Sequence, residues 1–162
     1  MSEFATALSG AGLFLVLGAL MACLESSLMA LPEARIRALR DELGPSGDLL
    51  DRYLLDPART LSRLLAGRVI APIAATVMIV PLFVVRGDPW WVLGLVVVAV
   101  SFLYGVMLEV AVSIGRSRAR KIAPRALAWM RPLAMLLAPL AAPMERVGKL
   151  SLIHISEPTR PY

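Results

Sequence analysis

Three ionisable residues lie within or at the edges of long apolar stretches of this chain: Glu25, Arg68 and Glu109. A charged group costs about 2.5–3.5 kcal/mol at the centre of a membrane helix, so each should face other helices, water or an opposite charge unless it lies near a membrane surface. Glu25 is followed by Ser26 and Ser27, and these side chains offer carboxylate and hydroxyl oxygens. Such hard ligands suit Mg²⁺ or a similar cation that retains several waters. These residues therefore form a candidate cation site.

The same residues also admit a structural interpretation, which their chemistry alone favours. Glu25 would then mark the inner membrane interface, and Ser26 and Ser27 would donate hydrogen bonds to helix carbonyls four residues earlier, which is common in membrane helices. Glu109 is expected at a similar depth in its own span. The two glutamates could therefore share one cation site, or either could pair with Arg68.

No catalytic motif is recognisable in the sequence. The chain has one histidine, His154, and one cysteine, Cys23, and it contains no phosphate-binding glycine loop and no metalloprotease helix. Cys23 lies in an apolar stretch and is expected to behave as a small buried apolar residue. We therefore expect no enzymatic activity, and no cofactor apart from Mg²⁺ or a similar cation held by the carboxylate and hydroxyl oxygens of residues 25–27.

Composition indicates a membrane protein. Hydrophobic residues make up 58% of the 162 residues and charged residues only 18%, and the mean hydropathy is +0.72. A soluble domain of this size could not bury so much apolar surface. The net charge of +5 is concentrated in segments between apolar stretches, which is typical of membrane proteins and not of nucleic-acid-binding proteins. The lipid bilayer is therefore the expected partner, and nucleic acid is not.

Three stretches are long and apolar enough to cross a bilayer, at about residues 4–31, 61–85 and 89–112. Pro32 should end the first, because proline disrupts a continuing helix. Trp90 opens the third at the depth expected for an interfacial aromatic anchor. We predict an all-α integral membrane protein with three transmembrane helices and further amphipathic helices on the cytoplasmic side.

The segments outside these spans predict the orientation. Residues 32–63 are rich in charge and should form short amphipathic helices on the membrane surface or against neighbouring helices. Residues 112–150 form a second basic segment, and residues 122–147 fit a belt helix at the inner surface better than a fourth crossing, because Arg131 and three prolines interrupt them. The positive-inside rule then places the N-terminus outside the cell membrane and the C-terminal part in the cytoplasm.

The last residues, 151–162, differ in composition and periodicity from the rest of the chain. They resemble the translated sequencing-adapter tail of artefactually truncated gene predictions. We therefore expect residues 1–150 to form one transmembrane domain and the natural protein to continue beyond about Leu150.

Two segments, Met21–Leu31 and Leu54–Gly67, resemble the start of the transmembrane domain of the CNNM (cyclin M) and CorB/CorC-type family. The resemblance implies a homodimeric transport domain for Mg²⁺ or another divalent cation, with Na⁺-coupled efflux as one form, normally followed by cytosolic CBS domains. It also implies that Glu25 matches the first-helix glutamate of the family and Gly67 the glycine that enters the second helix. Small residues in the first span, such as Gly10, Gly12 and Gly18, would permit close helix contacts.

The oxygen chemistry and the resemblance together make Glu25, Ser26, Ser27, Gly67 and Glu109 the candidate metal-site residues. The chain departs from the family pattern beside them. The Pro-Lys pair expected after Glu109 is absent. Ala22 stands where a serine is expected, and Arg68, Val69 and Pro72 stand where asparagines are expected.

Arg68 is the departure with the largest electrostatic consequence. If it faces Glu25 or Glu109, its guanidinium would take the electrostatic place of a cation. Two hypotheses follow: a divergent divalent-cation transporter, or a degenerate, non-transporting scaffold or regulatory partner of an active relative.

Overall fold

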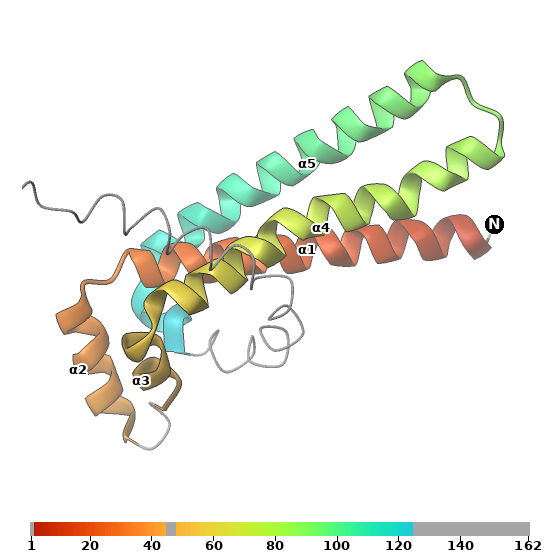
Figure 1. The fold of residues 1–162 in the computed structure, drawn as a ribbon. Helices are drawn as coiled ribbons and strands as arrows, with labels where there is room; N and C mark the ends of the chain where they lie inside the picture. Colours follow the sequence, from red (N-terminus) through yellow and green to blue (C-terminus); the bar gives the residue numbers. More distant parts are fainter. Residues whose placement is uncertain (1, 45–47, 125–162) are drawn as a thin grey trace, which may run out of the picture.

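The computed structural model describes residues 2–44 and 48–124, and this part of the chain is helical with short connections. Figure 1 shows α1, α4 and α5 lying along one another as a bundle, with α2 and α3 at the end opposite to the N-terminus. The helices are α1 (Ser2–Met29), α2 (Glu33–Leu43), α3 (Asp48–Leu55), α4 (Pro57–Val85) and α5 (Trp90–Ser117). The prediction of an all-α fold is confirmed.

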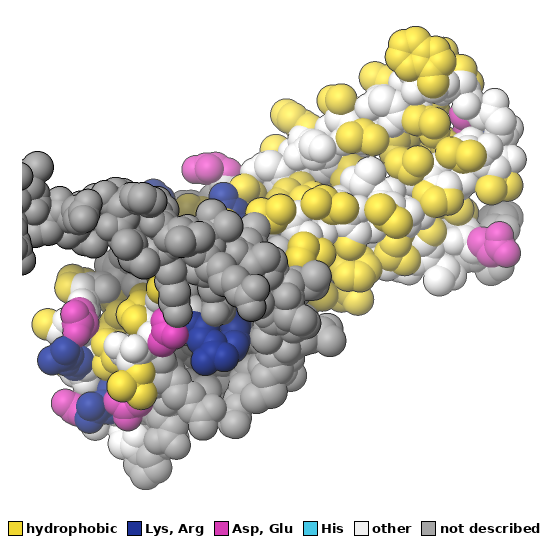
Figure 2. Space-filling view, viewed as in Figure 1, with side chains coloured by type: hydrophobic (Ala, Val, Ile, Leu, Met, Phe, Trp, Pro, Cys, Tyr) yellow, Lys and Arg dark blue, Asp and Glu magenta, His cyan; other side chains and the backbone are white. Residues whose placement is uncertain are grey.

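Three of these helices are long and apolar enough to cross a membrane. They are α1, α4 and α5, so the prediction of three candidate spans is also confirmed. Figure 2 shows hydrophobic side chains along the visible face of the bundle and charged side chains gathered around α2 and α3. The chain is therefore an integral membrane protein in which the polar residues collect at one end of the apolar bundle.

The helix ends differ from the predicted spans for local reasons. α1 ends at Met29 instead of residue 31, because Pro32 disfavours helical geometry at the residue before it. α4 begins at Pro57 instead of residue 61, because the Asp56 carboxylate accepts a hydrogen bond from the Arg59 N–H at 3.0 Å and caps the helix.

The third span also differs from its prediction. α5 begins at Trp90 and continues to Ser117, five residues beyond the predicted end. The first proline after Glu109 is Pro124, beyond the end of α5. The helix closes with a hydrogen bond from the Arg118 N–H to the Ile114 carbonyl at 3.0 Å. Of the belt helix predicted for residues 122–147, only residues 122–124 are described, and they are helical.

Apolar residues of α2 and α3 pack against the charged end of the bundle. Ile36 of α2 and Leu50 of α3 are almost completely buried, and both join a cluster with Leu24 and Leu28 of α1 and Leu64 of α4. These amphipathic helices were expected either on the membrane surface or against neighbouring helices, and the structure shows them against neighbouring helices. This packing fixes a polar cap at one end of the bundle.

Glycines allow α1 to approach both of its long neighbours. A side chain at Gly18 would meet Ala71 of α4 and Tyr104 of α5, and one at Gly115 of α5 would meet the Cys23 carbonyl and the Ser26 hydroxyl of α1. Because the Cys23 carbonyl belongs to the backbone, it cannot move aside as the end of a side chain could. Gly115 therefore sets the distance between α1 and α5.

We expect Gly115→Ala to destabilise the bundle by about 1–3 kcal/mol, since the added methyl overpacks a backbone contact. Gly12→Ala is the matched control, because nothing lies within 4 Å of a side chain built there. The measurement is the thermal unfolding midpoint of the purified protein in detergent. Equal midpoints for the two variants would contradict this account of the α1–α5 contact.

Candidate functional site

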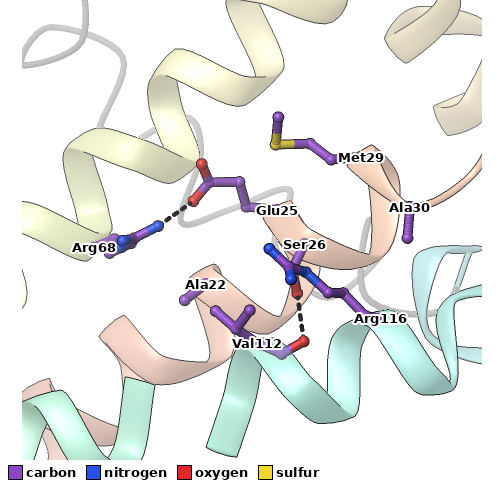
Figure 3. Close-up of a pocket in the computed structure, with 8 residues that line it drawn as sticks. All are labelled: Ala22, Glu25, Ser26, Met29, Ala30, Arg68, Val112 and Arg116. Atoms are coloured by element: carbon purple, nitrogen blue, oxygen red, sulfur yellow. Dashed lines mark hydrogen bonds and ion pairs between the residues drawn. The ribbon is translucent and has the colours of Figure 1, made fainter. Parts of the chain in front are cut away.

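A cavity of about 380 Å³ lies where the last turns of α1 meet α4 and α5. α1 contributes residues spaced three and four apart, which lie on one helical face. Figure 3 shows the lining side chains, with Arg68 reaching in from α4 and Arg116 from α5. The lining residues are Ala22, Glu25, Ser26, Met29, Ala30, Arg68, Val112 and Arg116.

An ion pair joins α1 to α4 at this cavity. Arg68 Nη1 donates a hydrogen bond to Glu25 Oε2 at 3.2 Å. The Glu25 side chain is 15% exposed and that of Arg68 is 34% exposed. A carboxylate removed this far from water needs a compensating charge, and the guanidinium provides it. Of the two partners considered for Arg68, the structure therefore selects Glu25.

The backbone beneath this pair has an unusual hydrogen bond. In a regular helix the Arg68 carbonyl would accept from the N–H of the residue four positions later, but that residue is Pro72, which has no N–H. The Tyr104 hydroxyl of α5 donates to the Arg68 carbonyl instead, at 2.7 Å. Tyr104 thus ties α5 to α4 at the residue that carries the guanidinium.

The two serines make local hydrogen bonds, with a spacing that differs from the prediction. Ser26 Oγ lies 2.9 Å from the Cys23 carbonyl and 3.3 Å from the Val112 carbonyl of α5. Ser27 Oγ donates to the Leu24 carbonyl at 2.8 Å. The expected acceptors lay four residues earlier, whereas the observed intrahelical acceptors lie three residues earlier. Ser26 lines the cavity, and Ser27 is fully buried and does not.

The remaining candidate residues do not join the cavity. Glu109 is exposed on α5, and Gly67 is buried next to Arg68 without lining the cavity. Within residues 2–44 and 48–124, no group of three or more His, Cys, Asp or Glu side chains is arranged to hold a metal ion. The structure thus brings together Glu25 and Ser26 and keeps them apart from the other three predicted ligands.

Arg116 is the charged cavity residue that was not singled out from the sequence. It was counted only as part of the basic segment after Glu109. The neighbouring Gly115 was the available signal, because a small residue in a transmembrane helix often marks the side that approaches another helix. A basic residue beside such a contact is placed near the facing helix, here α1.

Comparison with protein families gives a match over most of the chain. The family model described as the cyclin M transmembrane N-terminal domain (CNNM) matches residues 10–161, which include every cavity residue. The match also extends over residues 151–161, expected to be a foreign tail; these lie outside the described residues. No curated protein and no solved structure matches the chain.

The Tyr104–Arg68 bond can be tested by a double-mutant cycle with Pro72→Ala. We expect Tyr104→Phe to destabilise the protein by about 1–2 kcal/mol, because it leaves the Arg68 carbonyl without a donor. In the Pro72→Ala background the new Ala N–H can donate to that carbonyl, so the loss should be smaller. Unfolding midpoints in detergent measure both effects.

Tyr53→Phe is the control, since the Tyr53 hydroxyl makes no hydrogen bond within the described part of the chain. If Tyr104→Phe destabilises the protein equally with Pro72 and with Ala at position 72, the proposed role of Tyr104 is excluded.

Proposed function

The chain belongs to the CNNM (cyclin M) family through its transmembrane N-terminal domain, and from this premise we propose that it is a Mg²⁺-transport-related membrane domain whose cation site is closed by Arg68. The observation that carries the proposal is the 3.2 Å ion pair between Arg68 Nη1 and Glu25 Oε2. In this proposal the guanidinium occupies the place that a cation would take beside the carboxylate. The domain then acts as a non-transporting scaffold or as a regulatory partner of an active relative.

The ligands left around Glu25 support this closed state. A Mg²⁺ ion needs near-octahedral oxygen coordination. Ala22 and Met29 offer no oxygen from their side chains, and the Ser26 hydroxyl is directed to backbone carbonyls. An entering divalent cation would also be repelled by Arg68 and by Arg116. Binding would therefore require the guanidinium to leave Glu25 first.

One observation favours the second candidate function, divalent-cation transport with Na⁺-coupled efflux as one form. The Arg68 side chain is 34% exposed and borders a cavity of about 380 Å³, so it has space to swing away from Glu25. Arg68 would then be a displaceable gate. In that case Glu25 and Ser26 would contribute the protein oxygens to the ion, with water completing the shell.

A homodimer in the cell membrane is part of the proposal, and one face of α5 supports it. Gly94, Ser101, Gly105 and Glu109 fall within about a quarter of the helix circumference at 3.6 residues per turn, and all four are exposed. Small residues let transmembrane helices approach closely, and an intramembrane carboxylate favours a protein-facing position over lipid. A second copy that covers this face would bury Glu109 between subunits.

The proposed topology follows the charge distribution. We place the N-terminus outside and the α2–α3 end in the cytoplasm, because Lys and Arg concentrate at that end. The cavity then opens on the cytoplasmic side.

The closed site predicts how Mg²⁺ affects the protein. We expect millimolar Mg²⁺ to leave the wild-type unfolding midpoint unchanged and to give Glu25 no protection from a carboxylate-modifying reagent. Arg68→Asn removes the internal cation and adds an amide oxygen, so this variant should be both stabilised and protected by Mg²⁺.

Arg86→Asn, in the loop at the opposite end of the bundle, is the matched control and should stay insensitive to Mg²⁺. Protection of wild-type Glu25 by Mg²⁺ would instead support the transporter hypothesis. An Arg68→Asn variant that remains insensitive would remove Arg68 as the reason for closure.

The α5 face predicts the effect of a bulky residue on dimerisation. Gly105→Leu should reduce the dimer fraction by several-fold, because the side chain would separate the two helices. Gly12→Leu adds the same side chain at an open position of α1 and should leave the fraction unchanged. Mass photometry or light scattering in detergent measures the fraction, and equal dimer fractions for the two variants would exclude this interface.

A further inference from the structure

The cavity at the polar end of the bundle carries more positive than negative charge. Among the described lining residues there are two arginines, Arg68 and Arg116, and one acidic residue, Glu25. Glu25 pairs with Arg68, and none of the carboxylates whose side chains are described pairs with Arg116. Figure 3 shows both arginine side chains extending toward α1, one from α4 and one from α5. The cavity therefore has a surplus guanidinium and attracts an anion.

The depth of the cavity limits which anion can reach it. α1 is free of charge from Phe4 to Leu24, a length of about 31 Å at a rise of 1.5 Å per residue. This matches a hydrocarbon core of about 30 Å. Glu25, Arg68 and Arg116 all lie at the same end of this apolar length, where the hydrocarbon gives way to the lipid headgroups. The phosphates of the adjacent leaflet therefore lie at the level of the cavity.

The chemistry of the lining suits a phosphate group attached to an apolar body. A guanidinium presents N–H groups in a fork that matches two phosphate oxygens. Met29, Ala30 and Val112 supply an apolar wall. Basic pockets between transmembrane helices on the cytoplasmic side are suited to anionic lipid headgroups.

We propose that this cavity binds a phosphate group, carried by an anionic phospholipid of the adjacent leaflet, with Arg116 as the main ligand and Arg68 as the shared one. The inference rests on the closed cation site proposed above, because an open site would bring Mg²⁺ into the same cavity. In this proposal the phosphate neutralises the positive charge of Arg116, which Glu25 does not neutralise. A bound headgroup would also hold α5 against α1 at Ser26 and Val112.

The test uses the full chain, purified in detergent with EDTA. The retention of phosphatidylglycerol and of phosphatidylcholine is measured by native mass spectrometry. We expect wild type to retain phosphatidylglycerol preferentially and Arg116→Gln to lower that preference about fivefold, the effect of removing one basic contact to an anionic lipid. Arg116→Lys should lose less, because it keeps the charge. Arg35→Gln removes an exposed arginine of α2, at the same end of the bundle, that does not line the cavity, so it is the matched control and should behave as wild type.

A second arm separates the two sources of phosphate. Thermal midpoints are measured with millimolar inorganic phosphate in the absence of lipid, using sulfate-free buffer. If inorganic phosphate stabilises the wild type but not Arg116→Gln, and the wild type shows no preference for phosphatidylglycerol, the phosphate site is supported. Its ligand is then a soluble anion. Equal retention of both lipids with no effect of phosphate would overturn the proposal. Equal losses of preference in Arg116→Gln and Arg35→Gln would also overturn it.

These outcomes are distinct from failure of the proposed function. Stabilisation of the wild type by Mg²⁺ would show that the cation site is open, whatever the lipid result. Lipid indifference in a protein that stays insensitive to Mg²⁺ would overturn the phosphate inference alone.

Discussion

The high cost of placing charge in hydrocarbon governs how this chain is arranged. The apolar lengths of α1 and α4 leave Glu25 and Arg68 at the same end of the bundle, where the two side chains meet at 3.2 Å. Because the Glu25 carboxylate is mostly withdrawn from water, its negative charge is tolerated in the folded bundle only beside that guanidinium. The neighbouring contacts act on the same pair: Tyr104 replaces the donor that Pro72 lacks and so fixes the backbone of Arg68.

Much of the fold could be predicted from hydropathy, because long charge-free stretches have few alternatives to a membrane helix. The helix ends were less predictable, since α4 begins where Asp56 caps it and α1 ends where Pro32 forces a turn. α2 and α3 were predicted as amphipathic helices, but only the structure distinguishes packing on the bundle from packing on the membrane surface. Residues 125–162, with most of the predicted belt helix and the expected tail, lie outside the described residues.

The site was harder to predict than the fold, because it depends on how each helix is rotated about its axis. Sequence spacing places Glu25 and Glu109 near the same depth, but it does not say which of them faces inward. The small residues that determine these rotations are far apart in the sequence. Gly18 leaves space for the Tyr104 side chain, and Gly115 allows α5 to contact the backbone of α1. Once α5 is turned this way, Glu109 is left on an exposed face and Arg116 reaches the cavity. The charge pattern therefore left open whether Glu25 shares a site with Glu109 or pairs with Arg68, and only the packing shows Glu25 beside Arg68 and Arg116.

The central claim is that Arg68 serves Glu25 as an internal cation, and a double-mutant cycle tests it most directly. Glu25→Gln, Arg68→Met and the double variant are compared with wild type by their unfolding free energies in lipid nanodiscs. The account predicts a favourable coupling energy of about 1–3 kcal/mol, because each single change leaves a poorly hydrated charge without its partner. Additive effects of the two changes would show that the side chains do not interact in the membrane and would contradict the account.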